Sequence, residues 1–153
     1  MFIDLYSEED FAYDLDFFTE QVTIYKLLEK RVRTGVCMKP IRHNPWDKTK
    51  QSRFIESLML RIPMQPIYFD GANDSSWLVI DGFQRLNTLK SFILDRTMKL
   101  TNLEYFTYYN NYYFKQLPNN MQRRIEETYI TIHVIKAGTP ENIRYSIYNR
   151  INP

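Results

Sequence analysis

The feature that most constrains the fold is an abrupt change of apolar periodicity near the middle of the chain. Residues 77–80 (Trp-Leu-Val-Ile) form an unbroken apolar run of strand-forming residues, which is typical of a buried strand. Asp81 and Gly82 interrupt this run, and from Arg85 onward the apolar residues recur at helical spacing. The pattern predicts a buried strand, a tight glycine turn and a helix that follows at once.

The start of such a helix presents free backbone N–H groups and the positive end of its dipole, which suits phosphate. At about 100° per residue, Arg85 falls on the helix face that carries Leu89 and Phe92, so we expect it to reach the site beside the turn. Gln84 should project the other way. Two interpretations stay open, a phosphate site or a structural clasp between Arg85 and Asp81. The glycine-rich phosphate loops GxGxxG and GxxxxGK[ST] are both absent.

Composition indicates one domain of ordinary globular type. The chain has 153 residues, 44% of them hydrophobic, and its net charge of +2 neither demands nor excludes a nucleic-acid partner. Cys37 is the single cysteine, so no disulfide framework is expected and a reducing cytoplasm fits. No apolar run is long enough to cross a membrane and the acidic residues 1–10 are no signal peptide, which predicts a cytoplasmic protein without a membrane partner.

The remaining patterns predict an α+β fold with a small mixed β-sheet and packed helices. The expected helices are residues 7–18, 24–33, 47–61, 117–127 and 140–149, and the expected strands are residues 36–41, 66–69 and 129–135. Residues 100–114 hold many aromatic side chains around Asn110 and Asn111, and they are interpreted as a β-hairpin whose rings join the core. The alternative is a stacking platform for unpaired bases, but no lysine or arginine is interleaved before Lys115.

The usual signatures of covalent or metal-centred catalysis are missing. There is no HExxH motif and no HNH-type cluster, and His43 and His133 are isolated. The polar residues that remain are suited to binding phosphate and to positioning a metal ion or water. They are Asp81, Gln84 and Arg85 at the turn, Arg42 before Trp46, the predicted helix with Lys50, Arg53 and Glu56, and the pair Asn149 and Arg150.

Two long motif blocks follow each other along the chain. The first spans residues 46–68 and reads Trp-x3-Lys-x-Ser-Arg-x-Ile-Glu-Ser-Leu-x-Leu-x-Ile-Pro-x2-Pro-Ile-Tyr, and the second spans residues 79–89 and reads Val-Ile-Asp-Gly-x-Gln-Arg-Leu-x-Thr-Leu. These blocks resemble the N-terminal domain of GmrSD-type, modification-dependent restriction systems, which belongs to the ParB/sulfiredoxin-like superfamily. The resemblance covers roughly residues 24–153 and implies a ParB-like NTP-binding domain over residues 21–153, after an N-terminal extension at 1–20. A truncation of this domain at its C-terminus stays open.

The sequence departs from the family pattern at two places. The hallmark Asp-Gly-Gln-Gln-Arg has Phe83 in place of its first glutamine, and of an upstream aromatic-Gln-Arg pattern only Arg42 remains. In sulfiredoxin the equivalent turn carries a catalytic cysteine. Phe83 or Gln84 stands there in this chain, which excludes sulfinic-acid reduction.

The resemblance implies a domain that binds, and hydrolyses, a nucleoside triphosphate with Mg²⁺ at the Asp81–Arg85 turn. It would be the sensor domain of a DNA restriction or phage-defence system. The implied catalytic residues are Asp81, Gln84 and Arg85, with Asp81 also on the metal. The implied nucleotide-binding residues are Gly82, Arg42, Lys50, Glu56, Asn149 and Arg150. The implied partners are DNA and an HNH-type nuclease, on a second chain or in a missing C-terminal domain.

Two other functions stay open. In the first, the domain is a non-enzymatic DNA-binding or adaptor module, in which the same basic residues contact DNA phosphates and the turn is structural. In the second, Phe83 marks a degenerate site and the domain only docks a partner nuclease.

Overall fold

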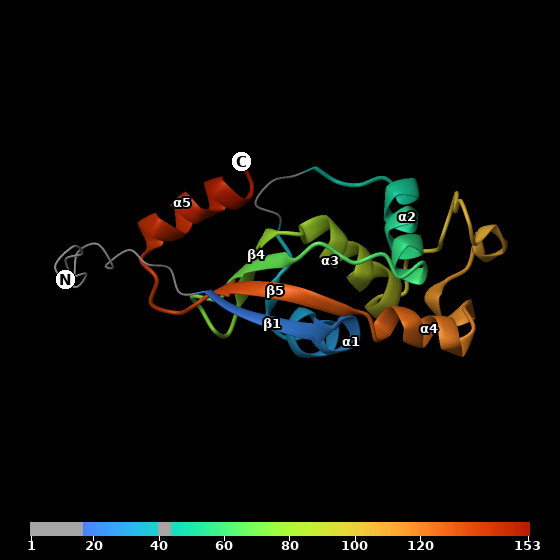
Figure 1. The fold of residues 1–153 in the computed structure, drawn as a ribbon, viewed down its shortest axis with the longest axis horizontal. Helices are drawn as coiled ribbons and strands as arrows, with labels where there is room; N and C mark the ends of the chain where they lie inside the picture. Colours follow the sequence, from blue (N-terminus) through green and yellow to red (C-terminus); the bar gives the residue numbers. More distant parts are fainter. Residues whose placement is uncertain (1–16, 40–43) are drawn as a thin grey trace, which may run out of the picture.

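The computed structural model describes residues 17–39 and 44–153 (Figure 1). Arg42 and His43 therefore lie outside the described residues, as does most of the helix predicted over residues 7–18. The last two residues of that predicted helix, Phe17 and Phe18, open a strand instead. They pair antiparallel with Ile135 and Val134, so the sheet already begins inside the segment that the sequence assigned to an extension.

A five-stranded mixed sheet forms the centre of the molecule, in the order β1-β5-β3-β4-β2. Its strands are β1 (Phe17–Thr23), β2 (Val36–Cys37), β3 (Ile67–Asp70), β4 (Trp77–Asp81) and β5 (Tyr129–Ile135). The pairs β1–β5 and β3–β4 are antiparallel, whereas β3–β5 and β2–β4 are parallel. The predicted α+β class and mixed sheet are confirmed, although β2 is shorter than the strand expected over residues 36–41.

The helices occur close to where the apolar periodicity placed them. They are α1 (Ile24–Leu27), α2 (Lys48–Met59), α3 (Phe83–Leu89), α4 (Asn119–Glu126) and α5 (Glu141–Ile151), and π-helical turns over 28–32 and 90–94 extend α1 and α3. Asp47 caps α2 by accepting the N–H of Lys50 at 2.8 Å, at the first residue of the helix predicted over 47–61. Among the described residues, no helix combines the length and the apolar character needed to cross a membrane.

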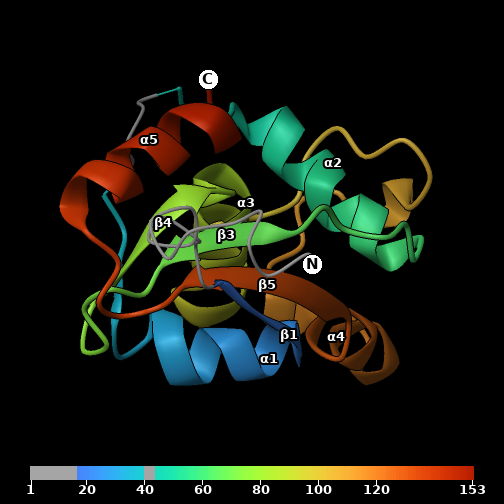
Figure 2. The same ribbon diagram turned by 60° about the vertical axis from the view of Figure 1, so that its left-hand side comes forward.

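The two faces of the sheet are covered differently. Alternate residues of the strands, such as Phe69, Val79 and Ile132, face a large core that also contains the buried residues of α1 to α4. The opposite face packs a smaller cluster, in which Ile80 and Ile135 meet Ile147 of α5. Figures 1 and 2 show α5 and α1 on opposite sides of the strands. Helix α5 is therefore the main helical cover of the second face.

The β-hairpin predicted over residues 100–114 is wrong. The segment contains two short 3₁₀ turns, Thr107–Tyr109 and Phe114–Gln116. Its ends meet at an isolated bridge between Lys99 and Tyr113 and through backbone hydrogen bonds of Leu100 with Tyr112 and Asn111, but no strand forms. Asn111 does adopt positive φ, as its residue type allows. The aromatic side chains of this segment differ in burial. Phe114 is buried, whereas Tyr105 and Tyr108 are exposed.

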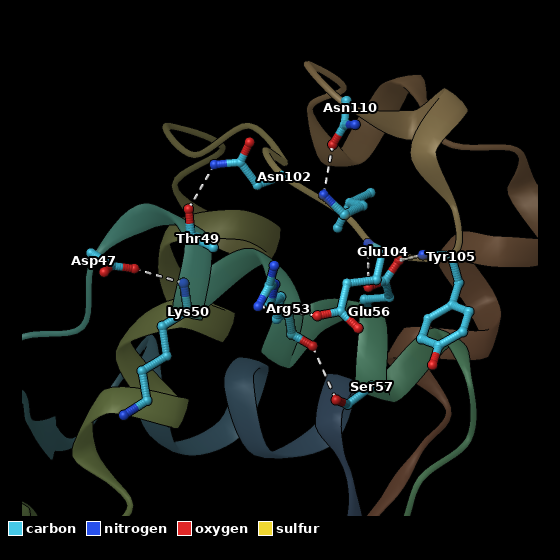
Figure 3. A network of polar contacts seen from close by, with 11 residues as sticks. Asp47, Thr49, Lys50, Arg53, Glu56, Ser57, Asn102, Glu104, Tyr105 and Asn110 are labelled. Carbon is cyan, nitrogen blue, oxygen red and sulfur yellow. Dashed lines mark hydrogen bonds and ion pairs between the residues drawn. The ribbon is translucent and has the colours of Figure 1, made fainter.

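A buried carboxylate explains why this segment does not form a hairpin (Figure 3). Glu56, which is 3% exposed, accepts the backbone N–H groups of Glu104, Tyr105 and Phe106 at 2.9–3.0 Å. Ser52 of the same helix accepts the N–H of Thr101 at 3.0 Å. Backbone donors that a β-ladder would need are thus bound to the side chains of α2.

These contacts predict a pH-dependent stability. Burial alone would raise the pKa of the Glu56 carboxyl, but the three backbone N–H groups and the charge of Arg53 outweigh burial and lower this pKa. A carboxyl with a lower pKa in the folded than in the unfolded state stabilises the folded protein. This stabilisation is fully present above the unfolded pKa of about 4.3 and is lost as the pH falls through the folded pKa. We expect Glu56→Gln to cost about 2 kcal/mol at pH 7 and to flatten the loss of stability in acid.

Urea unfolding of the two proteins between pH 3 and pH 7 measures both effects. The control is Glu20→Gln, which changes an exposed carboxylate on β1 and should keep the wild-type pH profile. Parallel pH profiles for wild type and Glu56→Gln would contradict the role given to this carboxylate.

Candidate functional site

A cavity of about 320 Å³ opens where β4 ends and α3 begins. Three separate parts of the chain line it: the segment before α2, the β4–α3 turn and the C-terminal end of α5. Figures 1 and 2 both show the end of α5 next to the segment that leads into α2. The lining residues are Asn44, Trp46, Val79, Ile80, Asp81, Gly82, Phe83, Gln84, Arg85 and Asn152.

Gly82 makes the turn possible on two separate grounds. Its φ of 106° lies in the left-handed region, where a residue with a Cβ is strained. In addition, a Cβ at this position would lie 3.0 Å from Ile67 Cγ1 and 3.1 Å from Arg85 Nη2. Gly82 is also the N-cap of α3, whose first N–H groups have no acceptor within the helix.

Arg85 is held as a clasp and still faces the cavity. Its guanidinium donates to the backbone carbonyl oxygens of Gln65 and Pro66, the latter at 3.1 Å. The carboxylate of Asp81 lies 3.8 Å from Nη2, and the Arg85 side chain is 14% exposed. These contacts are those of a structural clasp between Arg85 and Asp81. The two side chains are nevertheless accessible from the cavity, because both line it.

The charge of Arg85 is poorly compensated. Burial lowers the pKa of its guanidinium, and the Coulombic attraction of Asp81 restores only part of that loss. The guanidinium nevertheless stays protonated, because arginine does not lose its proton in proteins. The protein therefore places a desolvated cation beside a cavity, with two neutral carbonyls and one distant carboxylate as partners. An anion in the cavity would improve this balance.

Gln84 does not project away from the site as its helical position suggested. Its side chain lines the cavity, and its Oε1 atom accepts the backbone N–H of Trp46 at 3.2 Å. This bond joins the first turn of α3 to the segment before α2. Asp81, Gly82, Gln84 and Arg85 are thus brought together, as the hallmark motif required.

Other predicted site residues lie elsewhere. Both carboxylate oxygens of Glu56 are taken by the backbone of residues 104–106, so Glu56 anchors a loop and does not line the cavity. Lys50 lies at the edge of the site, its Nζ 5.2 Å from the centroid of the Trp46 ring. Asn149 and Arg150 are exposed on α5 and do not line the cavity. Arg42 is outside the described residues.

Three lining residues, Asn44, Trp46 and Asn152, received no role from the sequence. Trp46 is the first residue of the motif block over residues 46–68, and Asn152 lies only within the wider span of the family resemblance, residues 24–153. These were the signals that could have found them. Asn152 follows α5 and its Nδ2 donates to the carbonyl oxygen of Ile80 at 3.5 Å. For Asn44 we find no signal in the sequence.

A buried ionic contact fixes the end of α5 against the sheet. The Asp70 carboxylate on β3 is 1% exposed and accepts from Arg144 Nε at 2.8 Å and from the Tyr148 hydroxyl. Burial, followed by the bond to Asp70, raises the pKa of Tyr148 well above its usual value, so the hydroxyl keeps its proton. This anchoring keeps Asn152 at the cavity.

The donor set at the cavity suits a metal ion that arrives with its ligand. Asp81 is the one carboxylate among the described lining residues, and the described chain contains no group of three or more His, Cys, Asp or Glu residues placed to hold a metal. Mg²⁺ in phosphate sites is commonly held by one or two carboxylates together with the phosphates and water. The residues therefore fit Mg²⁺ bound to a nucleotide.

The geometry of Gly82 predicts a large effect of a single methyl group. We expect Gly82→Ala to lower the free energy of unfolding by roughly 2–4 kcal/mol, the sum of left-handed strain and overpacking. Gly138→Ala is a matched control, because Gly138 also has positive φ (91°) but nothing within 4 Å of the added methyl. Urea titration measures both variants, and equal destabilisation would show that the contacts at Gly82 are unimportant.

The comparison with known families agrees with this geometry. A family model described as the N-terminal domain of the GmrSD restriction endonuclease matches residues 42–153. No curated protein and no solved structure gave a match. The matched span covers most of the chain and includes every residue that lines the cavity, while β1, α1 and β2 precede it. The chain belongs to the family of GmrSD restriction endonuclease N-terminal domains, and is thereby a component of a DNA-acting restriction system.

Proposed function

We propose that the domain binds a nucleoside triphosphate with Mg²⁺ in the β4–α3 cavity, as the sensor part of a restriction system that acts with a nuclease. The observation that carries this proposal is the partly buried guanidinium of Arg85 at the wall of the cavity, whose one ion-pair partner among the described residues is Asp81 at 3.8 Å. Arginine forms charge-assisted hydrogen bonds with phosphate, which are among the strong ones in proteins. Polyphosphate is the anion that best fits a charged wall next to a helix start.

The remaining lining residues support the same ligand. A volume of about 320 Å³ is within the range of small-molecule sites. Gly82 has no side chain to keep phosphate oxygens from the backbone, and the free N–H groups of α3 can donate to them. Trp46 is partly exposed at the cavity and offers an aromatic face to a nucleobase.

Hydrolysis would use the two polar side chains that precede Arg85 in the motif, Asp81 and Gln84. In this reaction water attacks the γ-phosphorus, and the bond to the β–γ bridging oxygen breaks. Gln84 uses its Oε1 for Trp46, so its amide nitrogen is left to hold a water molecule. Asp81, whose side chain is 42% exposed, would hold Mg²⁺, which neutralises phosphate charge. Arg85 then serves binding and charge neutralisation.

Calorimetric titration with Mg²⁺ complexes of ATP, GTP and CTP tests nucleotide binding. We expect one of them to bind the wild-type chain, and Asn152→Asp to weaken that binding roughly tenfold or more, because it adds a negative charge inside the cavity. Asn149→Asp is the matched control. It makes the same chemical change one helical turn earlier, at an exposed position outside the cavity, and should bind like wild type.

A second substitution separates binding from fold. Arg85→Ala should weaken nucleotide binding by about 2 kcal/mol or more, but it also removes bonds to two carbonyls and will lower the thermal midpoint. Arg33→Ala controls for the loss of an arginine, since Arg33 is an exposed partner of Glu29 on another surface. The proposal fails if no nucleotide binds, or if Asn152→Asp and Asn149→Asp bind equally.

One observation favours a second function. The carbonyl bonds of Arg85 give it a structural task, as expected for an adaptor module whose turn only holds the fold. In that case the chain binds DNA without nucleotide, and its DNA affinity falls steeply with salt. DNA binding measured at several salt concentrations, with and without nucleotide, distinguishes the two functions.

A further inference from the structure

A second groove, of about 350 Å³, lies between the end of α2 and the start of β5. One wall is the segment that follows α2, from Arg61 to Met64. The other wall is the end of α4 with the residues that lead into β5, from Arg124 to Tyr129. None of the residues that line the β4–α3 cavity lines this groove.

Two arginines in the groove lack an anionic partner. Within residues 17–39 and 44–153, neither Arg61 nor Arg124 forms an ion pair. The Nε atom of Arg124 is buried and has no hydrogen-bond acceptor among the described residues, which is rare and costly in a folded protein. A negatively charged ligand in the groove would pair the charge of this guanidinium.

The groove also exposes two large hydrophobic side chains beside its polar ones. Ile62 is 51% exposed and Tyr129 is 67% exposed, although both are large hydrophobic side chains. Pro63 and Met64 continue the same wall. Tyrosine, methionine and arginine are the residue types enriched at protein interfaces, and tyrosine and arginine carry much of the binding energy there. The lining of the groove has this composition.

We propose that this groove docks a segment of a partner protein in which a carboxylate side chain stands next to an apolar one. The carboxylate would accept from Arg124 and Arg61, and the apolar side chain would cover Ile62 and Tyr129. A DNA backbone fits less well, because the described lining of the groove contains no lysine and exposes apolar side chains, Ile62 and Tyr129, that a phosphate would not cover. A peptide supplies both parts of the ligand.

Fluorescence anisotropy with a labelled synthetic peptide containing Leu-Asp-Glu-Phe tests the proposal on the full chain. We expect binding that weakens roughly tenfold or more for Arg124→Glu. It should weaken similarly when the peptide carries Leu-Asn-Gln-Phe. The matched control is Arg123→Glu, because Arg123 precedes Arg124 on α4, is exposed and does not line the groove. That variant should bind like wild type.

Ile62→Asp keeps the test valid if Arg124→Glu does not fold. Ile62 is already exposed, so its replacement should leave the thermal midpoint nearly unchanged while repelling the acidic peptide. The proposal is overturned if the peptide does not bind, if Arg123→Glu and Arg124→Glu weaken binding equally, or if a labelled DNA oligonucleotide binds in the groove with the same dependence on Arg124.

Discussion

The fold around the candidate site depends on how one buried guanidinium is bound. Arg85 stands in the first turn of α3 and reaches the carbonyl oxygens of Gln65 and Pro66, which precede β3. Since arginine cannot escape burial by losing its proton, the chain has to bring acceptors to it. The two carbonyls satisfy hydrogen bonds of the guanidinium, and the Asp81 carboxylate, 3.8 Å from Nη2, compensates part of its charge. The same contacts hold the turn in place and set the charge that the proposed phosphate would meet.

This contact also connects the two surface features of the domain. The chain between α2 and β3 lines the second groove with residues 61–64 and gives Arg85 its two acceptors with residues 65–66. Only a short stretch of backbone therefore separates the groove from the acceptors of Arg85.

Local patterns predicted the parts of the fold that depend on neighbouring residues. The change of period at Asp81 and Gly82 placed the junction of β4 and α3, and the helix predicted over residues 47–61 corresponds to α2 with its cap Asp47. The predicted hairpin does not form because the backbone N–H groups of residues 104–106 donate to Glu56, which is about fifty positions away in sequence. The pattern of Glu56 on its helix shows an acid at the margin of an apolar face. It cannot show that a distant loop will cover this acid.

The sequence predicted the residues of the β4–α3 turn in the candidate site, but it did not predict which residue at the end of α5 lines the cavity. The hallmark motif brings Asp81, Gly82, Gln84 and Arg85 together because they are adjacent in sequence. The opposite wall depends on how α5 is rotated on the sheet, which the Asp70 contact to Arg144 fixes. With α5 held in that rotation, Asn149 and Arg150 face outward, and Asn152, just past the helix end, lines the cavity. The family resemblance extends to the end of the chain and therefore includes the segment that closes the site. Which residue of that segment meets a ligand is decided by packing on a different strand.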